Sequence, residues 1–91
     1  STKYAATSKL EERTLTISQD GKLFFQNEPV ERKDLISVLK NAFSKQDDKT
    51  LVLRADKNVS YGIVVDVMDA AKGAGLRRIV APTIIEPEKN P

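Results

Sequence analysis

The sequence predicts a two-layer α+β domain in which a mixed β-sheet carries two helices on one face, in the chain order β-β-α-β-α-β. Three features support this class: apolar runs of strand length, two amphipathic stretches with helical spacing, and strands in which apolar and polar residues alternate imperfectly. A sheet covered on both faces has nearly continuous apolar strands. The alternation therefore indicates helices on one face and a second face that is partly open.

Residues 13–26 are predicted to form a β-hairpin with a bulged turn. A two-residue turn at Asp20-Gly21 would scatter the apolar side chains over both faces of the hairpin, whereas a three-residue loop, 19–21, places them on one face. Gly21 then takes the left-handed conformation of the bulge residue. The cross-strand pairs expected in this register are Ile17 with Leu23 and Leu15 with Phe25. Phe24 is consequently turned toward the opposite face.

A turn at Asn27-Glu28-Pro29 and then an amphipathic helix are predicted next. The apolar stripe of this helix follows the i, i+3, i+4, i+7 spacing and consists of Leu35, Val38, Leu39 and Ala42, with Phe43 beside them. Glu31 is a poor N-cap, so we expect the first turn of the helix to fray. The polar residues 46–49 connect this helix to the next strand.

The segment Thr50 to Thr83 predicts two parallel strands joined by a helix. The strands are the short apolar runs Leu51 to Ala55 and Arg78 to Pro82. Ser60 is suited to cap the start of the helix, because its hydroxyl can accept a bond from a free amide of the first turn. Gly75 follows the last periodic residue, where a left-handed conformation commonly ends a helix. Strands joined in this way are parallel, with a right-handed crossover.

The two faces of this second helix follow from a rotation of about 100° per residue. The inner face is predicted to contain Tyr61, Val64, Met68 and Ala71, and the outer face Gly62, Asp66, Asp69 and Gly73. We therefore expect Tyr61 to lie in the core with its hydroxyl at the periphery. Asp66 and Asp69 are interpreted as part of a solvated face and not as a pair of catalytic carboxylates.

Composition limits the chemistry that the domain can perform. Its 91 residues suit a single domain. The absence of cysteine and histidine excludes a thiolate nucleophile, an imidazole base and the usual zinc sites. The charged residues Arg54, Asp56 and Lys57 lie around the end of a strand, and an aspartate in that position usually binds the backbone amides of a turn. We therefore predict that the chain is not an enzyme and has no catalytic residues, no metal site and no cofactor.

An ordered set of short motifs resembles the periplasmic domain of the ExbD/TolR family. The matching positions are Arg54-Ala55-Asp56-Lys57, Val59, Tyr61-Gly62, Val67-Met68-Asp69, Ala74-Gly75 and Ile79, with Asp20-Gly21-Lys22-Leu23-Phe24 and Glu28-Pro29-Val30 upstream. The resemblance covers residues 13–83. Val59-Ser60-Tyr61-Gly62 is closer to the TolR branch and Arg54-Ala55-Asp56-Lys57 to the ExbD branch, so both branches stay open.

The resemblance implies a periplasmic domain, anchored to the inner membrane, of a motor subunit that is driven by the proton motive force. In that family the domain dimerises and binds an energy-transducing partner, TonB in one branch and TolA in the other, with peptidoglycan as an additional ligand in the TolR branch. A transmembrane helix before the domain carries the proton-binding carboxylate and contacts a channel subunit of the ExbB/TolQ type. We accordingly interpret residues 1–12 as a flexible linker from a missing transmembrane helix, 13–83 as the folded domain and 84–91 as a C-terminal tail.

The candidate partner-binding residues lie on the open face and along the last strand. An open apolar face or an unprotected sheet edge can receive a partner strand or a second subunit. Pro82 lacks the amide that a central ladder needs and is best tolerated at an edge. The complete set of candidates is Phe24, Val52, Arg78, Val80, Ala81, Pro82, Ile84 and Ile85.

Nucleic-acid binding is the alternative function. A sequence pI near 9.0 and the adjacent Phe24-Phe25 on a strand are loosely similar to sheets that stack bases on aromatic side chains. However, the net charge is only +2 and the longest basic run is Arg77-Arg78. We therefore predict no nucleic-acid partner. Binding that weakens steeply with added salt would favour this alternative.

Overall fold

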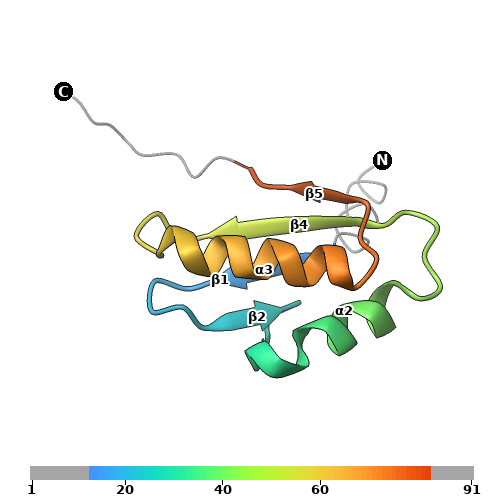
Figure 1. The fold of residues 1–91 in the computed structure, drawn as a ribbon, viewed down its shortest axis with the longest axis horizontal. Helices are drawn as coiled ribbons and strands as arrows, with labels where there is room; N and C mark the ends of the chain where they lie inside the picture. Colours follow the sequence, from blue (N-terminus) through green and yellow to red (C-terminus); the bar gives the residue numbers. More distant parts are fainter. Residues whose placement is uncertain (1–12, 83–91) are drawn as a thin grey trace, which may run out of the picture.

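The computed structural model describes residues 13–82 of the chain and has the two-layer α+β fold predicted from the sequence (Figure 1). The strands are β1 (Thr14–Ile17), β2 (Leu23–Phe25), β3 (Glu28–Val30), β4 (Thr50–Ala55) and β5 (Arg78–Val80). The helices are the 3₁₀ helix η1 (Arg32–Asp34) and the α-helices α2 (Leu35–Phe43) and α3 (Tyr61–Gly73). The predicted linker, 1–12, and tail, 84–91, lie outside the described residues.

The strands form one mixed sheet in the order β3-β2-β1-β4-β5. β2 is antiparallel to both β1 and β3, whereas β4 is parallel to both β1 and β5. The parallel arrangement of β4 and β5 confirms the expectation from their connecting helix. Pairing between β1 and β4 joins the N-terminal meander to the β-α-β unit.

The β1–β2 hairpin has the bulged turn and the register predicted from the sequence. Ile17 lies opposite Leu23, and Leu15 lies opposite Phe25. The amide of Gly21 donates to the carbonyl of Ser18 at 2.9 Å, which closes the turn. Gly21 has a φ of 85°, the left-handed conformation that glycine adopts most readily.

Strand β3 was predicted to be part of a turn, and this prediction was wrong. The turn consists only of Gln26 and Asn27, whose φ values are 53° and 69°, and the chain then pairs with β2 from Glu28. A proline within a three-residue segment argues against a strand, except at a sheet edge. Pro29 occupies such an edge, so the sheet has five strands where the sequence predicted four.

The amphipathic stripe of α2 is buried as predicted. Leu35, Leu39 and Phe43 are buried, and the rest of the stripe packs against them. No side chain caps the start at Glu31, and the first turn is the tighter helix η1. At the other end, Lys49 Nζ donates to the carbonyl of Phe43 at 2.5 Å and satisfies one of the free carbonyl groups.

Both ends of α3 are closed as the sequence predicted. Ser60 Oγ accepts a hydrogen bond from the amide of Ile63 at 3.3 Å. At the C-terminus, Gly75 has a φ of 94° and donates to Lys72. The next amide, that of Leu76, donates to Ala71 at 3.1 Å, which completes a Schellman motif.

Tyr61 is not in the core, which corrects the prediction for α3. Its side chain is 81% exposed, while Val67 and Ala71 are fully buried. At about 100° per residue, Tyr61 is rotated by about 120° from Val67 around the helix axis. The predicted stripe was therefore turned too far toward Met68. The predicted outer face, which includes Asp66 and Asp69, is exposed.

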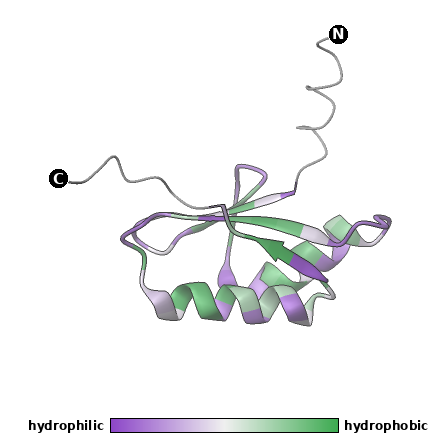
Figure 2. Cartoon of the chain, turned by 90° about the horizontal axis from the view of Figure 1, so that it is seen from above, coloured by the Kyte–Doolittle hydropathy of each residue, from purple (hydrophilic) through white to green (hydrophobic). Residues whose placement is uncertain are grey.

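The core lies between one face of the sheet and the two α-helices, and Figure 2 shows α3 on one side of the strands. Alternate residues of β1, β2 and β4 are buried, as expected for a sheet that is covered on one face. The buried side chains are Leu15, Ile17, Leu23, Phe25, Leu35, Leu39, Phe43, Leu51, Leu53, Val67, Ala71, Ala74 and Leu76. No polar or charged side chain of residues 13–82 is buried.

Replacing Gly21 with alanine is expected to lower the free energy of unfolding by about 1–3 kcal/mol, because alanine adopts a positive φ only with strain. The added Cβ would also lie 2.9 Å from Ile63 Cδ1, although this flexible methyl group can shift. Gly62→Ala is the matched control, since a Cβ at Gly62 meets no atom within 4 Å. Urea unfolding followed by circular dichroism measures both. Equal stability of the two variants would contradict the role of Gly21.

Candidate partner-binding surface

The apolar residues predicted for the uncovered face do lie opposite the helices. Phe24, Val52 and Val80 occupy the outward positions of β2, β4 and β5, and each is partly exposed. Val52 lies beside Val80, but Phe24 lies beside Thr16 of β1. Val52 pairs on its other side with Thr14. The threonines of β1 therefore separate Phe24 from the two valines.

The outer edge of β5 carries backbone groups that have no backbone partner among residues 13–82. In an extended strand, successive residues direct their N–H and C=O groups to opposite edges. The amide of Arg78 donates to the carbonyl of Lys49, at the start of β4, at 3.2 Å, so Arg78 and Val80 face β4. Ile79 therefore directs its backbone groups away from the sheet, and Ala81, two residues further along, shares this direction where the chain continues extended.

A second hydrogen bond shows which neighbouring strand each backbone group of β4 faces. The amide of Val52 donates to the carbonyl of Arg13 at 2.9 Å, on the β1 side. The neighbouring residue Leu51 therefore directs its backbone groups toward β5, which agrees with the direction of Arg78. The amide of Arg77 also donates to Lys49, at 2.9 Å, where the chain enters the strand.

The opposite edge of the sheet lacks its central backbone donor because of Pro29. The two-residue turn before β3 makes Phe25 and Glu28 a hydrogen-bonded pair, with their backbone groups directed at each other. Pro29 is the next residue and directs its nitrogen outward, where proline has no hydrogen to donate. β3 therefore offers no backbone donor at the centre of its outer edge, whereas β5 offers those of Ile79 and Ala81.

The predicted last strand is shorter than expected. β5 ends at Val80, while Ala81 and Pro82 are exposed and outside the ladder. The backbone of Pro82, like that of Val80, faces β4. Because proline has no N–H to donate to β4, the pairing ends before this residue. Ile84 and Ile85, the remaining predicted site residues, lie outside the described residues.

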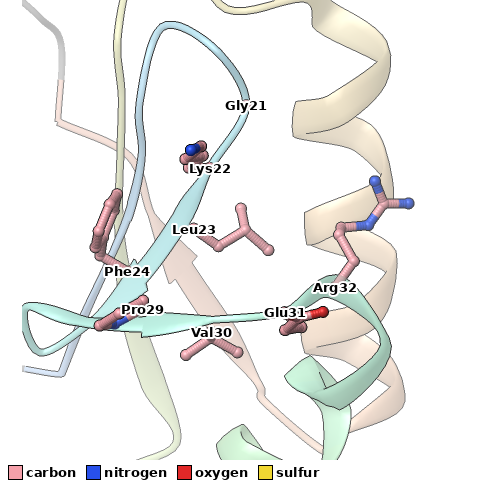
Figure 3. Close-up of a pocket in the computed structure, with 8 residues that line it drawn as sticks. All are labelled: Gly21, Lys22, Leu23, Phe24, Pro29, Val30, Glu31 and Arg32. Atoms are coloured by element: carbon pink, nitrogen blue, oxygen red, sulfur yellow. The ribbon is translucent and has the colours of Figure 1, made fainter.

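A cleft that the sequence analysis missed lies where β3 ends (Figure 3). It has a volume of about 610 Å³ and is lined by Gly21, Lys22, Leu23, Phe24, Pro29, Val30, Glu31 and Arg32. Figure 3 shows Phe24 and Pro29 on one side of the strands and Leu23 and Val30 on the other. The cleft was not predicted because Glu28-Pro29 was assigned to a turn and not to a strand. Recognising β3 would have placed Pro29 beside Phe24.

Asp56 and Asp66, two of the carboxylates considered in the sequence, make polar contacts within the domain. Asp56 Oδ1 accepts a hydrogen bond from the amide of Asn58 at 2.8 Å, which confirms the predicted turn. Arg32 Nη2 lies 2.7 Å from Asp66 Oδ2, and both side chains are about half exposed, at 52% and 54%. Such an exposed pair contributes at most about 1 kcal/mol. It joins the start of the first helical segment to α3.

The turn of the first hairpin contains a perturbed carboxyl group. The hydroxyl of Ser18 donates to Asp20 Oδ1 at 2.5 Å. This hydrogen bond lowers the pKa of Asp20, with a smaller contribution from the charge of Lys22. The carboxyl is fully exposed, so the interaction orders the turn and does not indicate an acid or a base for catalysis.

The described residues contain neither a metal-binding group nor a membrane-spanning helix. Within residues 13–82, no three His, Cys, Asp or Glu side chains are grouped so that they could hold a metal ion. Over the same residues, no helix has the length and apolar character that crossing a bilayer requires.

Comparison with known proteins defines the class of this chain. Residues 1–84 match the family model described as "Biopolymer transport protein ExbD/TolR". Biopolymer transport protein ExbD of Escherichia coli (strain K12) is 34% identical over 65 residues, which cover 71% of this chain and 46% of that protein. Biopolymer transport protein exbD2 of Vibrio cholerae is 34% identical over 65 residues, covering 71% and 48%. Putative biopolymer transport protein ExbD of Synechocystis is 30% identical over 64 residues, covering 70% and 24%.

These matches are to transport proteins and not to enzymes, as the resemblance implied. The chain belongs to the ExbD/TolR family. The expectation that it is not an enzyme is confirmed by this assignment. The chain spans about half the length of the E. coli and Vibrio relatives that it matches, at 46% and 48%.

Replacing Pro29 with threonine is expected to increase self-association, because the new amide N–H would point outward from β3 and could pair with a second chain. Sedimentation velocity over a range of concentrations measures the effect. Glu28→Thr is the matched control, since the amide of Glu28 already faces β2 and the change adds no outward donor. If Pro29→Thr associates no more than Glu28→Thr, the proline does not protect this edge.

Proposed function

We propose that this chain is the periplasmic domain of an inner-membrane motor subunit driven by the proton motive force, and that it binds an energy-transducing partner of the TonB or TolA type by adding a strand to β5. The family assignment supports the class of machine. The observation that carries the binding mode is the difference between the two sheet edges. Ile79 and Ala81 present donors and acceptors that have no backbone partner among residues 13–82, whereas Pro29 removes the central donor from β3.

Strand addition suits a domain that must hold a partner under load. Main-chain hydrogen bonds supply affinity, and side chains at alternate positions supply selectivity. These bonds lie across the strand direction, so a pull along the partner strand loads several of them together. The parallel pairing of β5 with β4, and of β4 with β1, would carry this load into the centre of the sheet.

The side chains around β5 indicate what the partner strand presents. Val80 and its neighbour Val52 form an apolar pair on the uncovered face, and Ile79 faces the core side. Arg78 is exposed at the start of the strand. A partner strand with one apolar residue near Val80 and an acidic residue near Arg78 would therefore be preferred.

The same edge suits a homodimer. A second copy that pairs β5 with β5 across a two-fold axis would use one surface on both subunits. Dimerisation and partner binding would then compete for the groups of Ile79 and Ala81. Peptidoglycan, which the resemblance implies for the TolR branch, and a channel subunit of the ExbB/TolQ type, which contacts a preceding transmembrane helix, complete the proposed set of partners.

An NMR titration of the chain with TonB-derived peptides, TolA-derived peptides and soluble peptidoglycan fragments tests this proposal. We expect chemical-shift changes centred on Arg78 to Pro82, with smaller changes at Val52. The identity of the peptide that binds assigns the branch. Changes centred on Asp66 and Asp69, on the outer face of α3, would contradict strand addition.

Replacing Ala81 with proline is expected to weaken peptide binding about three- to tenfold, the effect of losing one backbone hydrogen bond. Ala81 is exposed and lies outside the ladder, so the fold should be retained. The control is Ala81→Val, which keeps the N–H and should bind like the original chain. Equal affinities for the two variants would exclude a backbone contact at this position.

A further inference from the structure

The positive charge of the domain is concentrated at one end. This basic end comprises the side chains of Arg13, Lys45, Lys49, Lys72, Arg77 and Arg78, accompanied by only two acidic residues, Asp47 and Asp48. The rest of residues 13–82 carries six basic and seven acidic side chains. The net positive charge of the described domain therefore resides entirely at this end, although the sequence contains no long basic run.

Backbone hydrogen bonds bring these separate segments together. The amide of Arg77 donates to the carbonyl of Lys49, which joins the loop after α3 to the loop after α2. The amide of Val52 donates to the carbonyl of Arg13, which places the start of β1 alongside. In Figure 1 the starts of β4 and β5 and the C-terminal ends of both α-helices lie at the same, right-hand end.

Helix capping explains only part of this concentration. Basic residues are favoured near helix C-termini because they complement the helix dipole. Lys49 performs this role for α2 through its bond to Phe43, and the backbone of Gly75 and Leu76 closes α3. Lys45, Lys72, Arg77 and Arg78 are exposed. None of these four side chains forms an ion pair with another residue of the range 13–82.

We propose that the basic end is a docking surface for the anionic phospholipids of the membrane. The inference rests on the proposed function in one respect, the membrane anchor that precedes the domain. The described chain begins at the basic end, with Arg13, so a membrane segment preceding residues 1–12 would hold this end toward the bilayer. Exposed lysine and arginine side chains near an anionic surface each contribute about 1 kcal/mol of attraction.

Docking at this end would orient the proposed partner site. β5 begins at the basic end with Arg78 and runs away from it, as Figure 1 shows. Its free edge would therefore extend from the membrane surface toward the interior of the periplasm. The attraction acts over about 10 Å at 0.1 M salt, so ionic strength would control the docked fraction.

Co-sedimentation of the chain with vesicles tests this inference. The vesicles contain equal parts of phosphatidylglycerol and phosphatidylethanolamine, with phosphatidylcholine vesicles as the neutral reference. We expect binding to the anionic vesicles alone, reduced by added salt. The triple variant Lys45→Gln, Lys72→Gln, Arg77→Gln should bind about tenfold or more weakly. The triple variant Lys22→Gln, Lys33→Gln, Arg54→Gln loses the same net charge elsewhere and should bind like the original chain.

Three outcomes would overturn the inference. They are no binding of the original chain to anionic vesicles at low salt, an equal loss in both triple variants, and tighter binding to a single-stranded oligonucleotide than to vesicles at matched phosphate concentration. The last outcome would identify the basic end as a nucleic-acid surface. Failure of the peptide titration together with retained vesicle binding would count against the proposed partner site alone.

Discussion

The parallel pairing of β1 with β4 is the contact on which the rest of this domain depends. Every other strand pair joins segments that follow one another along the chain, through a turn or through a helix. β1 and β4 are distant in sequence, and their register, Thr14 with Val52 to Ile17 with Ala55, brings the two halves together. Leu15 and Leu53 thereby become neighbours at the centre of the core. Without this pairing neither half could bury its apolar side chains.

The core occupies only one side of that central pair, and this constraint governs where function can reside. Both α-helices cover the same face, so the opposite face keeps Thr14 and Thr16 at its centre, with apolar side chains toward its margins. Among residues 13–82, where no side chains are grouped to hold a metal ion, the exposed edge, the cleft and the charged end are the features suited to recognise another molecule. Recognition by these features would depend on backbone hydrogen bonding, surface shape and charge distribution. It would not require a reactive side chain.

Local patterns predicted local structure well, and they failed where the outcome depended on distant neighbours. The hairpin register followed from keeping four apolar side chains on one face, and the caps at Ser60 and Gly75 depend only on adjacent residues. Tyr61 was misplaced because the buried face of α3 is set by the sheet beneath it. β3 was missed because a proline excludes a strand except at an edge, and edges are defined only once all strands are ordered. The basic end could not be predicted from the sequence because its residues come from three separate segments of the chain.

The proline in β3 has a consequence for assembly. A sheet with two receptive sides can add subunits at both and grow without limit, as open-ended filaments do. Here Pro29 removes the central backbone donor from one edge, so we expect a strand to add at the other edge alone. In the proposed binding mode, two copies that pair through β5 would form a closed dimer. A copy that binds a partner strand there would likewise have no second edge at which to extend. In this binding mode, Pro29 would thus limit strand addition to one contact per subunit.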